Sequence, residues 1–175
     1  MLNQTSRFRF ANMPKSANDV ASEIETTMGE SWLPRLYRER ILKMRTRAYE
    51  FPALPKNATP QIHHTLLGIE LKVGRRRMLC PDLATARYLA GFARLGCKAI
   101  AIPYDITKIL QVADELESSW HRMLLLAEQR AHDAAESVRA RVRRLLIDRV
   151  RDQIATAGAG ARAPEFARST KQRRR

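Results

Sequence analysis

Hydrophobic and polar residues alternate with a helical period in the first part of this chain. Ser16 and Asn18 are suited to cap a helix that Gly29 ends, and Ser31 is suited to cap a second helix with Pro34 in its first turn. The apolar residues of these segments are Val20, Ile24 and Met28, and then Leu33, Leu36, Tyr37, Ile41 and Met44. Their spacing predicts two successive amphipathic helices.

A period of two replaces the helical period after a proline-rich connector at residues 50–60, which begins with a short edge strand around Tyr49–Phe51. Thr65–Val73 is predicted to be one strand. Its two faces carry Leu67, Ile69, Leu71 and Val73, and Gly68, Glu70 and Lys72, respectively. Gly74-Arg75 is predicted to be a two-residue turn that leads back through Arg77–Cys80, which completes a β-hairpin.

A third helix is expected between Asp82, its capping residue, and Gly96, which ends it. The apolar run "CKAIAIP" then predicts a buried strand at residues 97–103. The order of strand, helix and strand favours a βαβ crossover. The predicted fold is therefore α/β, with a small mixed β-sheet that includes the hairpin and the crossover, packed by helices and followed by a long helical C-terminal extension.

Two further helices are predicted in the C-terminal part of the chain. Apolar residues keep a three-four spacing from Ile106 to Ala127, and the helix is expected to break near "RAHDAAES" before an arginine-rich amphipathic helix. The predicted organisation is a flexible basic arm (1–15), an α/β core with the long helix (16–130), the arginine-rich helix (131–157) and a disordered basic tail (158–175). The long helix (106–130) is also a candidate for pairing with a second copy of the chain.

The composition adds a strongly basic character to this picture. The 175 residues carry a formal charge of +14, and 45% of them are hydrophobic, which is enough for a packed core. A compact protein of this charge is typical of proteins that bind a polyanion, with nucleic acid as the first expectation. Two cysteines and no apolar run of about 20 residues favour a cytoplasmic or nucleoid-associated protein without membrane insertion.

Two groups of arginines are the predicted contacts to nucleic acid. Arg75, Arg76 and Arg77 stand at the tip of the predicted hairpin, where an exposed position favours contact with phosphates. The C-terminal helix carries Arg139, Arg143, Arg144 and Arg151 among its arginines. Because these arginines spread around more than half of the helix, the pattern indicates sequence-independent electrostatic binding, with the charges of the second helix as a further contribution.

Glu70 and Lys72 raise a separate possibility, because residues two apart on a strand point to the same side. A nuclease uses such a pair to hold Mg²⁺ through the carboxylate and to orient the attacking water with the lysine. The alternative is the solvent face of a strand with a weak Glu–Lys contact, well below about 1 kcal/mol. The residues alone leave both interpretations open.

The order of "GIELKV", "LATARYLAGFARLG" and "KAIAIP" resembles the PD-(D/E)xK nuclease superfamily, nearest to the archaeal-type Holliday junction resolvases. The resemblance covers about residues 31–104. It places Glu70 and Lys72 on the E-x-K positions and implies a Mg²⁺-dependent DNA endonuclease. Where the family has proline–aspartate, this chain has Pro60-Gln61, and glutamine brings no charge to the metal.

Other acids in the chain are candidates for the missing family carboxylates. Glu50 or Asp82 is a candidate for the second metal ligand, and Glu39 for the helix glutamate of the family. Three functions therefore stay open: a nucleic-acid-binding protein, with DNA favoured over RNA, a Mg²⁺-dependent nuclease, and a helical assembly protein.

Overall fold

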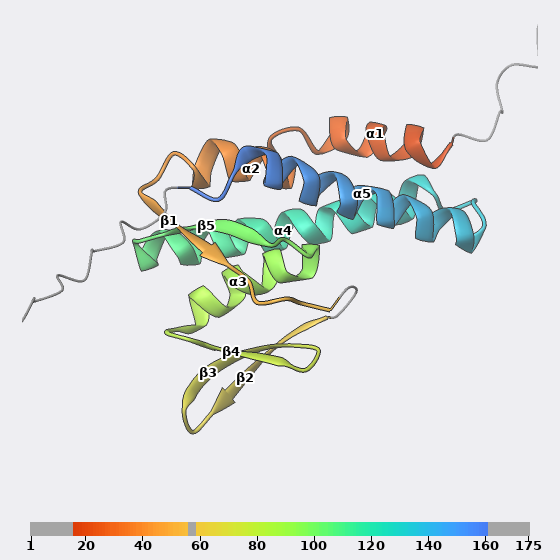
Figure 1. The fold of residues 1–175 in the computed structure, drawn as a ribbon. Coiled ribbons are helices and arrows are strands. Elements are labelled where there is room, and N and C mark those ends of the chain that lie inside the picture. Colours follow the sequence, from red (N-terminus) through yellow and green to blue (C-terminus); the bar gives the residue numbers. More distant parts are fainter. Residues whose placement is uncertain (1–15, 56–58, 161–175) are drawn as a thin grey trace, which may run out of the picture.

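A computed structural model describes residues 16–55 and 59–160, which form a layer of helices and two small antiparallel sheets, one of which lies below the helices (Figure 1). The elements are α1 (Ala17–Met28), η1 (Gly29–Ser31), α2 (Leu33–Leu36), η2 (Tyr37–Ile41), β1 (Thr46–Glu50), β2 (Pro60–Thr65), β3 (Gly68–Val73), β4 (Arg76–Cys80), α3 (Leu83–Leu95), β5 (Ala99–Pro103), α4 (Ile106–Arg130) and α5 (Glu136–Ala157). The α/β character and the helical C-terminal part are as predicted.

The helix ends follow the capping residues that the sequence offers, with one exception. Ser16 and Asp19 form a reciprocal capping box at α1, and Asp82 accepts a hydrogen bond from the backbone N–H of Thr85 at the start of α3. Gly96 ends α3 in the left-handed conformation. The predicted cap at Ser31 is wrong, because this residue belongs to the 3-10 turn η1 and α2 begins after Trp32 without a side-chain cap.

The strands form two separate antiparallel sheets, so the predicted single mixed sheet with a βαβ crossover is wrong. β5 pairs with β1, and β2, β3 and β4 form a meander in that order. Ala101 in β5 explains why the crossover fails. Its N–H donates to the Tyr37 hydroxyl at 2.8 Å, and its carbonyl accepts from the Tyr88 hydroxyl at 2.5 Å. Side chains from η2 and α3 therefore occupy backbone groups that a further strand would need.

The predicted strand Thr65–Val73 is two strands joined by a turn. The turn lies at Leu66-Leu67, where both side chains point into solvent with exposures of 107% and 81%. The Thr65 hydroxyl accepts from the N–H of Leu67 at 3.2 Å and donates to the carbonyl of Gly68 at 3.1 Å. This local bonding makes a hairpin of β2 and β3 where the alternating pattern indicated continuous extension. The β3–β4 turn at Gly74-Arg75 is as predicted.

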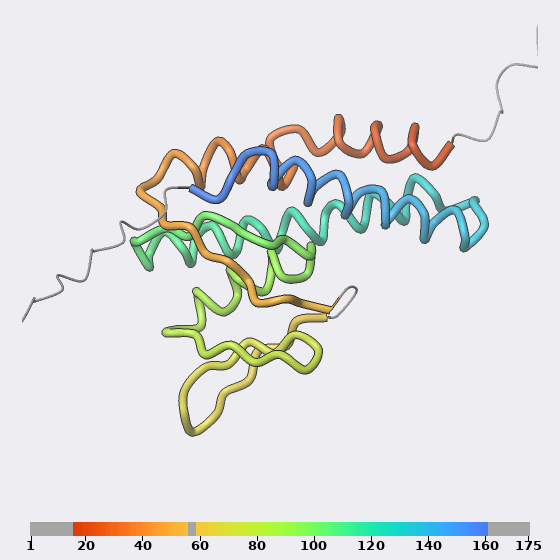
Figure 2. The backbone as a smooth tube through the Cα atoms, viewed as in Figure 1, coloured from red at the N-terminus to blue at the C-terminus, as the bar shows by residue number. Residues whose placement is uncertain are grey.

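One core joins the helical layer to the meander. α3 lies between the β2–β3–β4 sheet and α4, while α5 packs along α1 and the end of α2 (Figure 2). Val142, Leu146, Val150 and Ile154 place one stripe of α5 in this core. No helix among residues 16–55 and 59–160 combines the length and the apolar character needed to cross a membrane.

The predicted basic arm (1–15) lies outside the described residues, as do residues 161–175 of the predicted tail. Residues 158–160 are described, and the carbonyl of Gly158 accepts a hydrogen bond from the Tyr37 hydroxyl at 2.6 Å. The end of α5 is therefore tied to η2.

Candidate nucleic-acid interface

Glu70 and Lys72 lie on the outer face of the meander, as their spacing in the sequence predicts. Glu70 is 16% exposed and stands opposite His63 of β2 and Leu79 of β4. Its carboxylate is 3.7 Å from the guanidinium of Arg77. An arginine next to the carboxylate competes with a metal cation for the same negative charge.

The other acids that the family resemblance nominates lie elsewhere. Both carboxylate oxygens of Asp82 accept hydrogen bonds from Thr85 at the start of α3. Glu39 pairs with Arg35 one turn away at 2.9 Å, and Glu50 is on β1, in the other sheet. The described part of the chain contains no group of three or more His, Cys, Asp or Glu side chains arranged to hold a metal ion. These residues do not fit the Mg²⁺ site that the resemblance implies.

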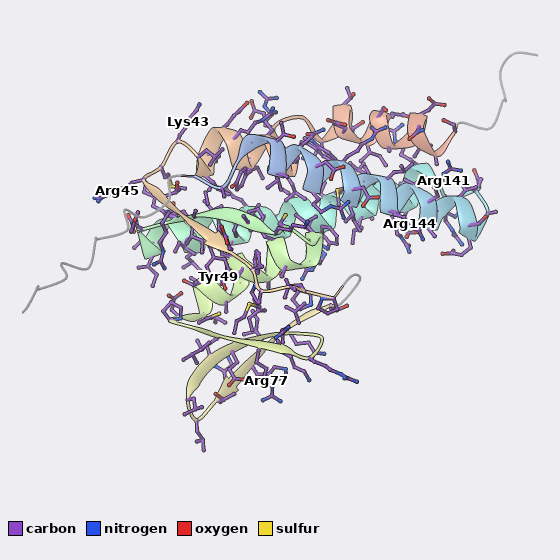
Figure 3. The ribbon with its side chains drawn as sticks, in the orientation of Figure 1. Lys43, Arg45, Tyr49, Arg77, Arg141 and Arg144 are labelled. Carbon is purple, nitrogen blue, oxygen red and sulfur yellow. The ribbon has the colours of Figure 1, made fainter. Side chains whose placement is uncertain are left out.

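The arginine triplet lies at the β3–β4 turn, where its side chains are exposed. Arg75 is in the turn, Arg76 begins β4, and Arg77 (labelled in Figure 3) follows it. The Arg77 side chain is 67% exposed and lies 3.7 Å from the carboxylate of Glu70. Gly74 packs so closely on Pro55 that an added Cβ would lie 2.6 Å from the proline ring. The arginine tip is therefore held against the β1–β2 connector.

A groove of about 650 Å³ begins at this connector and runs between α3, α4 and α5. Pro55 and Thr59 form its edge on the connector side. We call it the basic groove, because its lining side chains include Arg94, Arg143, Arg144 and Arg151, with Trp120, His121 and a single acid, Asp148. Three of the arginines predicted from the C-terminal helix thus converge with one from α3, next to the hairpin tip.

The basic groove continues into a second hollow on the other side of Gly96. The two share Gly96, Arg144, Asp148 and Arg151, and the second adds Lys98 from the turn before β5 and the acid Asp152. The lining cations therefore extend from the end of α3 along one face of α5.

The predicted arginines of α5 differ in the ion pairs that they form with acidic side chains. Arg151 is 2.6 Å from Asp148 and 3.5 Å from Asp152, and Arg143 forms an ion pair with Glu128 of α4. Arg139 pairs with Glu136 at 2.5 Å near the start of α5 and does not line the basic groove. Within residues 16–55 and 59–160, Arg144 is exposed and has no acid within ion-pairing distance (Figure 3).

A second concentration of cations lies at the opposite end of the helical layer. Arg38, Lys43, Arg45 and Arg47 are exposed along η2 and the start of β1. Arg45 lies 5.2 Å from the centre of the Tyr104 ring. These residues follow the predicted basic face of the second helix, whereas Arg40 is paired with Glu115 at 2.9 Å. They form a separate basic surface and do not line the groove.

The net positive charge is divided unequally between the described residues and the rest of the chain. The described residues contain 22 Lys or Arg and 17 Asp or Glu, a net charge of +5, so +9 of the total +14 belongs to residues outside them. Most acids among the described residues form ion pairs with arginines. The basic groove is thus a local excess of cations on a nearly balanced body.

Sequence reasoning missed the contribution of α3 and α4 to the groove. Trp120 falls on the apolar spacing of residues 106–127 and packs against the core, but it is only partly buried, and the Arg94 guanidinium lies 5.3 Å from its ring centre. No local pattern links these two residues, which are 26 positions apart, because their contact depends on how α3 packs against α4. Comparison with protein-family models, curated proteins and solved structures finds no match for this chain.

Proposed function

We propose that this protein binds nucleic acid through sequence-independent contacts to phosphates, and that it does so in the cytoplasm or on the nucleoid. The observation that carries the proposal is the convergence of Arg94, Arg143, Arg144 and Arg151 on one groove with a single acid. A guanidinium matches two phosphate oxygens at once, and four guanidinium groups line the groove. The arginine tip at Gly74–Arg77 extends the same surface.

The ion pairs in the groove are compatible with phosphate binding. Exposed ion pairs contribute about 0–1 kcal/mol, so a phosphate can displace Asp148 from Arg151 or Glu128 from Arg143 at little cost. Arg144 needs no such exchange. We therefore assign the first phosphate contact to Arg144. Arg143 and Arg151 then exchange their acidic partners, Glu128 and Asp148, for further phosphates of the nucleic acid.

The test is fluorescence anisotropy with a labelled DNA of about 16 nucleotides or base pairs, at about 50 mM and 200 mM salt. We expect the logarithm of affinity to fall linearly with the logarithm of salt concentration. Arg144→Gln should weaken duplex binding about 5- to 10-fold at low salt and reduce the slope by about 0.9, the value for one phosphate contact.

Arg122→Gln is the matched control, because it removes the same charge from an exposed arginine on a neighbouring helix. Arg122 donates to the Ser31 hydroxyl at 3.3 Å and does not line the groove. Equal losses in the two variants would mean that net charge, and not the groove, sets affinity. No binding to duplex, single-stranded DNA or RNA at low salt would refute the proposal.

The two competing functions are tested in the same samples. Cleavage that needs Mg²⁺ and is lost in Glu70→Ala would establish the nuclease, which the surroundings of Glu70 do not favour. A homodimer through α4 would appear as a concentration-dependent dimer in sedimentation. The apolar stripe of α4 is already buried within this chain, which leaves Ile106, Leu110 and Leu125 as its exposed large apolar residues. DNA is favoured over RNA only by the order of elements shared with the nuclease superfamily.

A further inference from the structure

A cavity of about 330 Å³ lies between β2, α3 and α4, beside the basic groove. Its walls are mainly apolar and include Pro60, Ile62, Leu83, Ala90, Leu116 and Trp120. The volume is at the lower end of the range of about 300–1,000 Å³ for small-molecule sites. The cavity therefore has room for one small planar group and not for a chain of them.

Gly91 gives this cavity an open wall on α3. It lies in the middle of the helix, where glycine is less stable than alanine by about 0.5–1 kcal/mol. Its backbone conformation does not require glycine, and an added Cβ would meet no atom within 4 Å. The absent side chain leaves free space that a ligand can fill against the helix backbone.

The cavity and the basic groove share Arg94, Leu95 and Trp120. Arg94 lies over the Trp120 ring, so a guanidinium plane and an indole stand together where the two spaces meet. Flat bases stack on aromatic rings and on guanidinium planes in proteins that hold single strands. A strand whose phosphates lie in the groove can turn one base inward at this junction.

We infer that the cavity holds the base of an unpaired nucleotide while Arg143, Arg144 and Arg151 hold neighbouring phosphates. This inference rests on the proposed function and specifies its substrate as single-stranded nucleic acid. A paired base in a duplex cannot enter, because its faces are covered by stacking and its edge by its partner. Preference for single strands then follows from the shape of the site.

The polar groups of the cavity supply both kinds of hydrogen-bonding partner for a base edge. Arg87 lines it and donates to Glu117 at 2.6 Å, and it is 2.8 Å from Asp114. Glu117 also lines the cavity. Its carboxylate accepts from base N–H groups, while the guanidinium of Arg87 donates to base carbonyls or ring nitrogens. Every base carries such an edge, so single strands of different sequence can bind.

The first test uses the unchanged protein and three labelled DNAs of about 16 nucleotides: a mixed-sequence single strand, its duplex, and a single strand of abasic nucleotides. The abasic strand keeps every phosphate and removes every base. We expect it to bind about 5- to 100-fold more weakly than the ordinary strand, the loss of one stacked base. Equal binding of the two single strands would overturn the inference.

The second test fills the cavity. Gly91→Leu places an apolar side chain in the space and favours the helix, so the variant should fold. We expect single-strand affinity to fall about 5- to 100-fold, to the level of the abasic strand, with duplex affinity unchanged. Ser118→Leu, which adds the same side chain at an exposed position of α4 outside the cavity, is the control. Single-strand binding unchanged in Gly91→Leu would also overturn the inference.

Failure of this inference is distinguishable from failure of the proposed function. If Arg144→Gln weakens all DNA binding while the abasic strand binds like the ordinary one, phosphate binding in the groove stands and the base site does not. If the unchanged protein ignores every polynucleotide at low salt, both fail.

Discussion

Tyr37→Phe removes a single buried oxygen that connects three parts of the fold. The Tyr37 side chain is fully buried, and its hydroxyl accepts from the N–H of Ala101 and donates to the carbonyl of Gly158. Burial is the main reason that the pKa of Tyr37 is raised. The ring itself contacts Phe92 edge-on at 5.7 Å between centres, and phenylalanine keeps that contact. The substitution therefore isolates the hydrogen bonds.

The expected loss follows from what each partner can do without the hydroxyl. Ala101 is fully buried, and its N–H would be left without an acceptor, which costs about 1–3 kcal/mol. Gly158 is only partly buried, so water can replace the donor to its carbonyl at a small further loss. We predict that Tyr37→Phe lowers the free energy of unfolding by about 2–3 kcal/mol, a large share of the roughly 5–15 kcal/mol of a typical domain.

Urea unfolding measures this change through the midpoint, with the slope of free energy against urea unchanged. For a slope of about 1–3 kcal/mol per molar, the midpoint should fall by about 0.7–3 M. Two Tyr→Phe variants serve as controls. Tyr88→Phe should lose less, because an under-bonded carbonyl of Ala101 is tolerated better than an orphan N–H. Tyr49→Phe should lose less than about 1 kcal/mol, because among the described residues its hydroxyl has only the Met78 sulfur as a partner, at 3.6 Å.

The order of the three losses tests the role of the Tyr37 hydroxyl. If Tyr37→Phe unfolds within about 0.5 kcal/mol of the parent, or loses no more than Tyr49→Phe, the Ala101 N–H finds another acceptor. The Tyr37 bond would then not be what keeps β5 from pairing with a further strand, and the separation of the two sheets would need another cause.

The remaining predictions concern a turn and a buried thiol. Gly74→Ala should lower the free energy of unfolding in urea by about 1–3 kcal/mol, because φ is +60° and the new Cβ would lie 2.6 Å from Pro55. Gly91→Ala should instead raise the free energy of unfolding by about 0.5–1 kcal/mol. Equal effects would contradict the packing of the hairpin tip on the connector. Burial raises the pKa of Cys97 to about 12, against the opposing effect of Arg151, so the folded protein keeps a proton that the unfolded chain loses near pH 9. The contribution of Cys97 to the free energy of unfolding is complete below pH 9 and declines by about 1.4 kcal/mol per pH unit up to pH 12. Urea unfolding between about pH 8 and 10.5 tests this, because the decline of the free energy of unfolding with pH should flatten in Cys97→Ala. An equal decline in Cys97→Ala and the parent would contradict the prediction.

The helices were predictable because their ends carry their own chemistry. Ser16, Asp82 and Gly96 form or end the caps through contacts within a few residues, which a sequence displays directly. The cap at Ser31 failed because Pro34 and Trp32 fit a later start, after a 3-10 turn that carries no strong sequence signal.

The alternating pattern predicted which residues of a strand share a face, but it did not predict where the strands turn or how they pair. Leu66-Leu67 has none of the residues that mark turns, so the alternating pattern extended through it. The available signal was the pair Thr65 and Gly68, whose bonding closes the turn, with Gly68 at a φ of 121°. The pairing of β5 with β1 depends on Tyr37, more than 60 residues away from Ala101, and no local period contains that information.

The candidate site shows the same division between local and distant information. Arg144 and Arg151 are seven apart on one helix, so a shared face was predictable from spacing alone. Arg94 and Trp120 reach the same groove from two other helices, and only the packing of α3 on α4 brings them there. The helical spacing of Trp120 predicts that this residue lies on the side of α4 that faces the rest of the protein. The spacing does not reveal that a cavity and the basic groove lie on that side, and Trp120 lines both.

The excess positive charge of the chain and its basic groove would be separable causes of the proposed nucleic-acid binding. The chain carries a net charge of +14, of which +9 belongs to residues outside the described ranges, and net charge alone attracts a polyanion. Affinity from that source would respond to the removal of any surface arginine in the same way. Arg144→Gln and Arg122→Gln change the total charge equally, so a difference between them can only come from position. Position in turn matters only if a phosphate sits within reach of the Arg144 guanidinium, which is the contact that the groove predicts.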